Sequence, residues 1–233
     1  MALKLFLTGC LLTSSLFGYS FNDINCSCET KLKRVAYDVC YSDSKRSPIF
    51  SSYMLNKEKV NVVMQRYNTF LVDPDLKSSV RTITSEYNTC GDRGHLSPAS
   101  VNDWSDITRR QANYLSNIVV QDPELNRWGA WRASEVVSMN IVNKYNDIFE
   151  VSGAIYGNDK CNNLNVPSKM YKLIIIDSIK KYVVFLMDNK NISYDKLPST
   201  IIDINTLENK STIKFNIPID YSTMTINEIK DFM

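Results

Sequence analysis

The sequence predicts an α+β fold. Segments rich in Val, Ile, Phe and Tyr, a composition typical of strands, lie on both sides of a long helical stretch. Strands that surround a central helical region indicate an α+β architecture. The chain has 233 residues, of which 44% are hydrophobic, so it is long enough to bury one substantial core.

The strands are predicted from apolar runs with few charges. The last two runs are separated only by 177–181, so we expect them to be neighbouring strands joined by a tight connection. The four predicted strands are Val35–Tyr41, Phe149–Ile155, Met170–Ile176 and Tyr182–Met187.

The helical stretch is predicted to run over most of Ser105–Tyr145. In its second half Trp131, Glu135, Val136, Met139 and Val142 recur at steps of mostly three and four residues, the spacing of one helix face. The tail, Asn227–Met233, is expected to form a short helix.

The first twenty residues differ from the rest and predict a secretory signal over 1–20. Lys4 precedes an apolar run from Leu5 to about Phe17, and small residues follow at Gly18 and Ser20. Alternatives are a lipoprotein signal around Cys10 and an uncleaved anchor. With no internal repeat or linker, we expect a single domain over 21–233 with its core at about 30–220. The expected location is outside the cytoplasm, either periplasmic or extracellular.

Export would permit disulfides. Removal of the signal would leave an odd number of cysteines, so at least one thiol must stay free or pair elsewhere. Their pairing does not follow from the sequence, and the absence of a nearby histidine or second close pair argues against zinc at 26–28. The remaining cysteines are Cys26, Cys28, Cys40, Cys90 and Cys161.

The overall charge does not indicate a partner. Charged residues make up 22% of the chain and the formal net charge is +2, an ordinary globular composition that argues against a disordered or membrane protein. A polyanion would have to be bound by a local cluster of Arg and Lys. We expect no stable membrane association, and the oligomeric state is open.

The most informative segment is Cys90–Ala99, which holds His95, the only histidine. Histidine titrates near neutral pH, so it is the default general base. Beside it, Arg93 can donate two hydrogen bonds to a phosphate and Asp92 can orient neighbouring groups. A flexible Gly94 would let a bulky substrate approach. These residues predict phosphate chemistry at a strand-to-loop boundary.

The run Asp92-Arg93-Gly94-His95 resembles the signature of the DNA/RNA non-specific endonuclease family, the endonuclease G-like ββα-metal nucleases. The similarity extends over about 35–218. It includes the segments 66–74, 113–118, 125–135 and 151–156 in the family's order. The resemblance implies a ββα-metal nuclease fold, with a central antiparallel sheet and packed helices.

The resemblance also implies a function and a set of roles. The protein would be a secreted, metal-dependent endonuclease that hydrolyses DNA and RNA with little sequence preference, with Mg²⁺ or Mn²⁺ as cofactor. His95 would activate a water, Asn126 would bind the metal and Glu135 would hold metal-bound waters. The phosphate would be stabilised by Arg66, with Arg93 beside it. Asp92, Asn113 and Asn117 would line the site.

One departure from the family's spacing affects these roles. Arg127-Trp128 adds a residue between Asn126 and Trp131, and one residue in a continuous helix is a rotation of about 100°. Asn126 and Glu135 would then face different directions unless a bulge or loop absorbs the extra residue. Both Trp128 and Trp131 are expected to be packing residues.

The arginines at 109, 110, 127 and 132 are open to two interpretations, ordinary surface charge or a track for the phosphate backbone. Two other function classes also remain open: a nucleic-acid-binding protein without hydrolysis, and a phosphoesterase acting on nucleotides or phospholipids. Cleavage of circular DNA, with and without EDTA, would separate these classes from an endonuclease.

Overall fold

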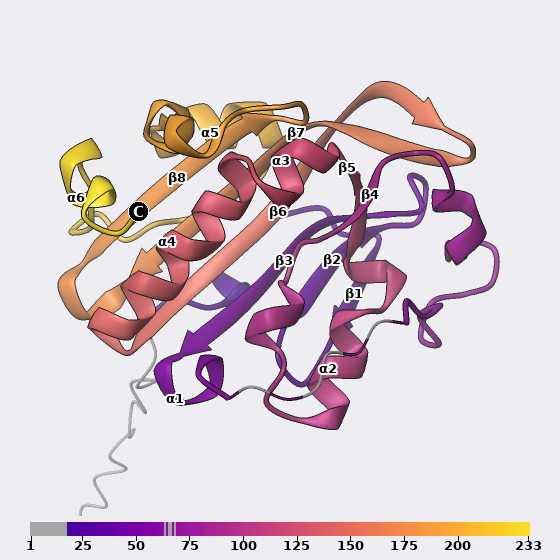
Figure 1. The fold of residues 1–233 in the computed structure, drawn as a ribbon, viewed down its shortest axis with the longest axis horizontal. Coiled ribbons are helices and arrows are strands. Elements are labelled where there is room, and N and C mark those ends of the chain that lie inside the picture. Colours follow the sequence, from indigo (N-terminus) through magenta and orange to yellow (C-terminus); the bar gives the residue numbers. More distant parts are fainter. Residues whose placement is uncertain (1–17, 63, 65–66, 68) are drawn as a thin grey trace, which may run out of the picture.

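A computed structural model of the protein describes residues 18–62, 64, 67 and 69–233, and Figure 1 shows its fold. One large sheet has the strand order β1-β2-β3-β6-β7-β8-β10, with β9 also paired to β8. All pairs are antiparallel except β10 with β8. The predicted α+β fold with a central antiparallel sheet is confirmed. The strands are β1 Thr30–Lys33, β2 Asp38–Ser42, β3 Ser47–Asn56, β6 Asp147–Cys161, β7 Leu164–Ile176, β8 Lys181–Asp188, β9 Ile201–Ile202 and β10 Ser222–Thr223.

The predicted strands correspond to β2, β6, β7 and β8, and β6 and β7 are longer than expected. β3 was not predicted, although it lies between β2 and β6. Its side chains are buried on both faces, and Ser51 and Ser52 are among them. The strand therefore lacks the alternation of apolar and polar residues by which a half-buried strand is recognised.

The predicted helical stretch over 105–145 is interrupted by a strand, β5, at Ile118–Gln121. β5 pairs with β4, Asp92–His95, in a small second sheet. The four consecutive buried residues of β5 carry no helical period. The α-helices are α1 Lys57–Val60, α2 Asp106–Ala112, α3 Pro123–Arg127, α4 Ala130–Tyr145, α5 Ile204–Ser211 and α6 Ile226–Lys230. The 3₁₀ helices are Phe21–Asp23, Thr84–Tyr87, Ala99–Val101, Leu115–Asn117, Asp177–Ile179 and Tyr194–Thr200.

The large sheet packs a hydrophobic cluster on each face. Along β7, Met170 and Ile174 belong to the cluster that contains Trp131 of α4, whereas Leu173 and Ile175 belong to the opposite cluster. This alternation follows from the two-residue period of a strand. α4 runs along the sheet in Figure 1. β5 contacts β3 and β7, and β4 contacts α3, so the large sheet and this short helix together hold the second, smaller sheet in place.

The packed structure extends beyond the core expected at 30–220. Tyr19 is buried against Phe149, with ring centroids 5.2 Å apart, and its hydroxyl donates to the backbone carbonyl of Phe215. Phe232 is buried near the other end. The boundary expected between residues 20 and 21 therefore cuts through packed structure. Most of the predicted signal, residues 1–17, lies outside the described residues.

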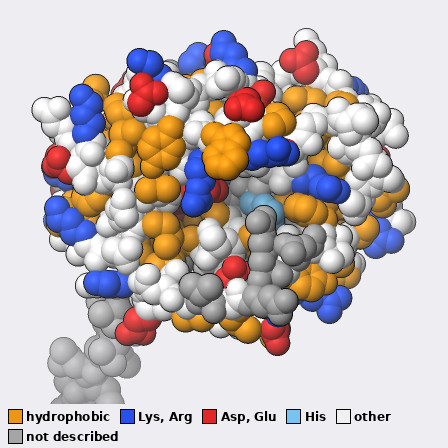
Figure 2. All heavy atoms as spheres, viewed as in Figure 1, with side chains coloured by type: hydrophobic (Ala, Val, Ile, Leu, Met, Phe, Trp, Pro, Cys, Tyr) orange, Lys and Arg blue, Asp and Glu red, His pale blue; other side chains and the backbone are white. Residues whose placement is uncertain are grey.

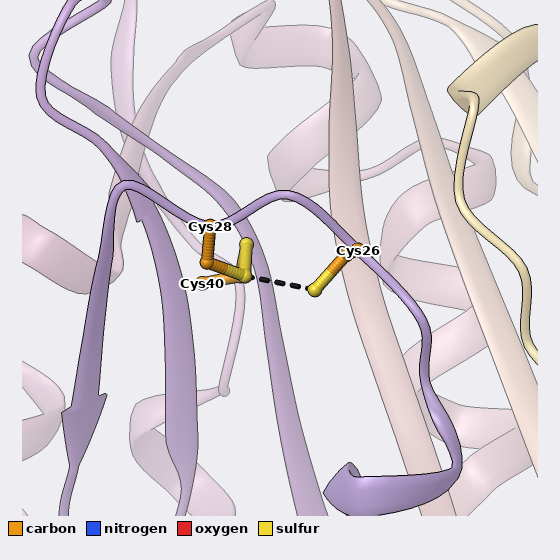
Figure 3. A group of neighbouring side chains, drawn as sticks. All are labelled: Cys26, Cys28 and Cys40. Carbon is orange, nitrogen blue, oxygen red and sulfur yellow. Dashed lines mark hydrogen bonds between the residues drawn. A yellow bond between two sulfur atoms is a disulfide. The ribbon is translucent and has the colours of Figure 1, made fainter.

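Two disulfides are formed. Cys28 pairs with Cys40, and Cys90 pairs with Cys161. Cys26 is the free cysteine of the described part of the chain, and its sulfur lies 2.8 Å from that of Cys28 (Figure 3). Burial raises the pKa of the Cys26 thiol, although Lys31 opposes the shift. A free Cys26 agrees with the expectation that at least one thiol stays free or pairs elsewhere.

Among the described residues, no helix is both long enough and apolar enough to cross a bilayer.

Candidate active site

The histidine lies at the end of β4, which pairs with β5 in the small antiparallel sheet. Asp92 pairs with Gln121 and His95 with Ile118 across it. Gly94 is buried, and a Cβ there would lie 2.0 Å from Oε1 of Gln121. The structure therefore corrects the role expected for Gly94, because its missing side chain makes room for Gln121 and not for a substrate.

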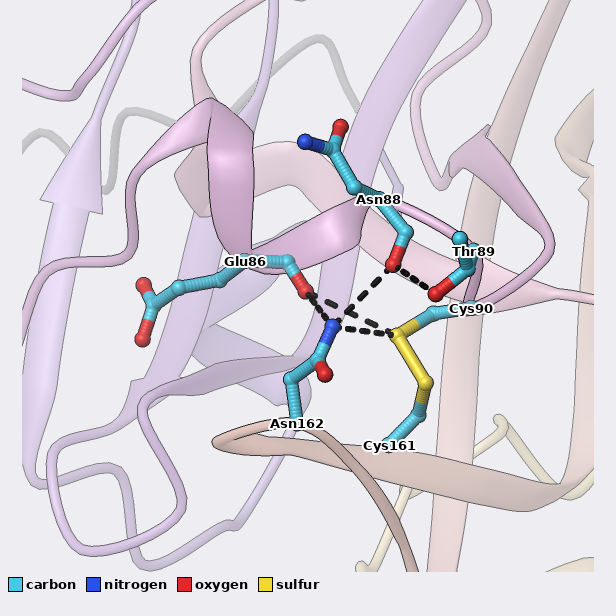
Figure 4. Close-up of a disulfide and its surroundings, with 6 residues drawn as sticks. All are labelled: Glu86, Asn88, Thr89, Cys90, Cys161 and Asn162. Carbon is cyan, nitrogen blue, oxygen red and sulfur yellow. Dashed lines mark hydrogen bonds between the residues drawn. A yellow bond between two sulfur atoms is a disulfide. The ribbon is translucent and has the colours of Figure 1, made fainter.

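The start of β4 is fixed by the second disulfide, which joins Cys90 to Cys161 at the tip of the β6–β7 hairpin (Figure 4). Asn162 reinforces the link, since its Nδ2 donates to the backbone carbonyls of Glu86 at 2.9 Å and Asn88 at 3.1 Å. The hairpin tip and the segment before Asp92 are thereby tied together across 71 residues of sequence.

A cavity with a volume of about 740 Å³ lies over this pair of strands. Figure 2 shows the histidine in a hollow of this face, with Lys and Arg side chains around it. Polar and charged side chains make up most of the cavity wall. The lining residues are Phe70, Gly91, Asp92, Arg93, His95, Pro98, Ala99, Ser100, Asp103, Asn126, Arg127, Arg132 and Glu135.

The imidazole of His95 is held by an amide and an aromatic ring. Its Nε2 lies 3.3 Å from Oδ1 of Asn113, and its ring centroid lies 5.4 Å from that of Phe70. Nδ2 of Asn113 donates to the backbone carbonyls of Arg109 at 3.0 Å and Tyr67 at 3.3 Å. These bonds fix the amide so that its oxygen faces the imidazole, and this oxygen can only accept a hydrogen bond. Nε2 therefore carries the proton of the neutral ring, and the lone pair is on Nδ1.

Asp92 joins two residues of α3. Its Oδ2 accepts from Nδ2 of Asn126 at 2.9 Å and from Nε of Arg127 at 2.8 Å, and its Oδ1 accepts from a second nitrogen of Arg127 at 2.5 Å. Partial burial alone would raise the pKa of Asp92, but the hydrogen bonds from Arg127 and Asn126 lower it. The carboxylate stays ionised and turns the amide nitrogen of Asn126 toward itself.

The extra residue before Trp131 does not rotate Asn126 away from Glu135. α3 ends at Arg127 and α4 begins at Ala130, so a break absorbs the insertion. Both Asn126 and Glu135 line the same cavity. The break packs closely against another segment: a Cβ on Gly129 would lie 2.5 Å from the carbonyl oxygen of Ile192, so only glycine fits there.

Glu135 lies at the base of the cavity with its side chain 16% exposed. Its Oε2 accepts from Arg132 at 2.9 Å. Burial raises the pKa of Glu135, and the charges of Lys172 and Arg132 oppose that shift. A carboxylate that is mostly buried but still faces the cavity is suited to hold water molecules there.

Arg93 lies with its guanidinium carbon 4.8 Å from the centroid of the Phe70 ring. The ring attracts the cation through its π face and uses none of its N–H donors. The described residues contain no carboxylate in an ion pair with Arg93. These donors can therefore serve a phosphate.

Two predicted site residues are placed differently, and a third is not described. Asn117 is completely buried, where its amide bonds to Ser51, to both backbone groups of Ser97 and to the carbonyl of Ala112, so it supports the segment after β4 from within the core. Asn113 is also buried and reaches the site only through His95. Arg66 lies outside the described residues.

Sequence reasoning did not assign Phe70 or Asp103 to the site, and it left Arg127 undecided between surface charge and phosphate track. Phe70 lies far before the histidine motif in the sequence, and Asp103 lies in an irregular loop after it. Neither position carries a recognisable spacing, although both residues line the cavity. Only the folded chain brings them to the cavity.

The donor set fits a divalent metal ion. Because Nδ2 of Asn126 donates to Asp92, its Oδ1 remains available as an oxygen ligand, which Mg²⁺ and similar hard cations prefer. Among the described residues, a group of three metal-binding side chains occurs only at Cys26, Cys28 and Cys40, two of which form a disulfide. At the cavity the protein therefore offers few ligands and leaves room for water and substrate.

Comparison with known proteins identifies the family. The model of the DNA/RNA non-specific endonucleases matches residues 18–221. The chain belongs to this family. Its members in general depend on a divalent metal ion. The mitochondrial nuclease EXOG of Xenopus laevis is 26% identical over 208 residues, covering 80% of this chain and 58% of that protein. Human mitochondrial endonuclease G is 26% identical over 161 residues, or 62% of this chain and 54% of that protein.

Two further comparisons bear on length and fold. Nuclease C1 of Cunninghamella echinulata is 25% identical over 215 residues, covering 83% of this chain and 85% of that protein. A crystal structure of an EndoG/EndoGI complex superposes with a TM-score of 0.74 at 21% identity, covering 83% of this chain and 89% of that chain. The predicted ββα-metal nuclease fold is confirmed. The chain spans little more than half the length of the EXOG proteins that it matches.

The expected export, to the periplasm or outside the cell, is wrong. Several of the curated relatives, from Xenopus laevis, human and fission yeast, are mitochondrial nucleases, and they point to mitochondria. A short apolar run after one positive charge is a compositional signal, and composition alone does not determine which membrane a segment addresses.

Proposed function

We propose that this protein is an endonuclease that hydrolyses internal phosphodiester bonds of DNA and RNA with little sequence preference. The observation that carries the proposal is the convergence, in one polar cavity, of the only histidine, a guanidinium with unused donors and an amide oxygen beside a carboxylate. A protein that only binds nucleic acid needs no such general base.

His95 acts as the general base. Because Asn113 accepts from Nε2, Nδ1 is the nitrogen that takes the proton from the attacking water. Phe70 packs against the imidazole at a tilt and limits its rotation. Arg93 donates to the non-bridging oxygens of the phosphate and stabilises the charge that develops there.

Asn126 is the proposed ligand of a divalent ion, Mg²⁺ or Mn²⁺, and Glu135 holds water molecules beside it. When bound, the ion neutralises charge on the scissile phosphate and assists departure of the leaving oxygen. Asp92 orients the amide of Asn126, and Arg132 keeps the carboxylate of Glu135 in place.

The first prediction concerns His95→Ala. The variant should lose roughly 10²–10⁴-fold in activity, because that is what a general base usually contributes and the sequence has no second histidine to replace it. The measurement is digestion of circular DNA and of RNA by the purified chain, with Mg²⁺, with Mn²⁺ and with EDTA. Circular DNA has no ends, so its cleavage requires an endonuclease.

Lys180→Ala is the matched control, since Lys180 lies on an exposed turn and does not line the cavity. It should cleave as wild type. If His95→Ala retains activity within a few-fold of wild type, the base is another group. Cleavage that persists unchanged in EDTA would remove the metal from the mechanism.

A further inference from the structure

Trp128 is the most exposed aromatic residue of the described chain, with 72% of its area accessible to solvent. The packing role expected for it is therefore not observed, whereas Trp131 is completely buried as expected. An exposed tryptophan leaves a large apolar face in water, and such faces are used for contacts. Figure 2 shows hydrophobic side chains exposed beside the basic ones around the histidine.

The position of Trp128 relates it to the cavity. It occupies the break between α3 and α4, directly after Asn126 and Arg127, both of which line the cavity. Arg132, one turn into α4, lines the same wall. In the sequence, Arg127 precedes Trp128 and Arg132 follows it. Their side chains are 58% and 49% exposed, so both cations face solvent.

The backbone that carries the indole is held firmly. The amide of Trp128 donates to the carbonyl of Glu124 at 3.2 Å, and the amide of Ala130 donates to the carbonyl of Ile192 at 2.8 Å. Gly129 between them fits only because it has no Cβ. A side chain presented on a fixed backbone loses little conformational entropy when it binds.

We propose that Trp128 stacks on an unpaired base of the substrate, next to the phosphate that occupies the cavity. An indole face and two flanking guanidinium groups match a single strand, whose bases offer exposed π faces and whose backbone carries one negative charge per nucleotide. In a duplex each base is already stacked on both sides, so Trp128 has no free face to meet. The substrate class favoured at this site is thus single-stranded DNA or RNA. The inference rests on the proposed function.

The test measures binding without cleavage. Wild type, Trp128→Ala and Trp128→Phe are titrated in EDTA into a fluorescein-labelled single-stranded oligonucleotide and into the same sequence as a duplex, with fluorescence anisotropy as the readout. Removal of a stacking side chain should weaken single-strand binding by roughly 5- to 150-fold, and Trp128→Phe should keep most of the affinity. Duplex binding should change much less. Ile219→Ala removes another fully exposed apolar side chain and should change neither.

A second measurement locates the base. An abasic site is moved along the single strand, and at one position the loss caused by Trp128→Ala should disappear, because the base that the indole contacts is already missing. Equal losses on single strand and duplex would overturn the inference in favour of a groove or backbone contact, and so would no loss on either. If wild type cleaves nothing, the proposed function fails, while the binding result stands on its own.

Discussion

Two ion pairs within the same fold show how burial decides what a charge does. Asp92 and Arg127 meet at the rim of the cavity, where their side chains are 13% and 58% exposed. Glu150 and Lys172 meet between the large sheet and α4, where their side chains are 1% and 0% exposed. Both pairs join a carboxylate to a cation, but only in the pair of Glu150 and Lys172 are both side chains fully buried.

The buried pair lies beneath the active site and is surrounded by polar partners. The carboxylate of Glu150 accepts from the hydroxyl of Tyr53, and Nζ of Lys172 donates to Ser152 at 3.0 Å and lies 4.9 Å from the centroid of the Trp131 ring. Burial beside this carboxylate raises the pKa of Tyr53 well above its usual value, so its hydroxyl keeps its proton. Removing one charge from such a group leaves the other without compensation.

The rim pair has a different use. The guanidinium of Arg127 is exposed, and pairs with an exposed member contribute little to stability. The carboxylate of this pair, however, also orients the amide of Asn126. The comparison therefore predicts that substitutions at the buried pair reduce stability, whereas substitutions at the rim reduce activity.

The largest effect is expected for Lys172→Met. It should lower the free energy of unfolding by about 3–5 kcal/mol, because it leaves the carboxylate of Glu150 buried without its cation. Urea denaturation followed by circular dichroism measures the change. The double variant Lys172→Met with Glu150→Gln should be more stable than the single one, since no net charge then stays buried. Equal instability of the two would mean that packing around Lys172, and not its charge, is what matters.

The next effect is expected for Asp92→Ala. This variant removes the acceptor that holds the amide nitrogen of Asn126, so the amide can rotate. Loss of such a supporting partner typically reduces metal affinity or activity by about 10–100-fold. A titration of DNA cleavage against Mg²⁺ should show a higher metal requirement, with a urea midpoint near that of wild type. An unchanged metal requirement would contradict the role given to Asp92.

The smallest effect is expected for Arg127→Ala, which keeps the bond between Asp92 and Asn126. Its unfolding free energy should fall within the error of the measurement, because the guanidinium is exposed. Its metal requirement should stay as in wild type, while the Michaelis constant for DNA should rise modestly through the lost cation. A loss as large as that of Asp92→Ala would show that the ion pair itself, and not the carboxylate alone, positions the amide.

The sequence predicted an element correctly where the pattern of apolar residues within that segment is typical of a strand or a helix. β8 and the second half of β7 are nearly continuous apolar runs, and the recurrence of apolar residues over the second half of 105–145 predicted α4. β3 and β5 were missed because both are buried on two faces and have no period of two residues. The histidine motif could be recognised because its residues are consecutive.

The sequence by itself determined the chemistry available to this protein: one histidine, the arginine and aspartate beside it, and the ordered segments that resemble one nuclease family. Tertiary structure decided how those groups are used. The helix is broken at Gly129, where the chain packs against Ile192, and Asn126 and Glu135 line one cavity. Packing buries Asn117 and leaves Trp128 in solvent. The disulfide partners were decided in the same way. Each of these outcomes depends on groups far apart along the chain, and no local pattern of residues specifies which of them will meet.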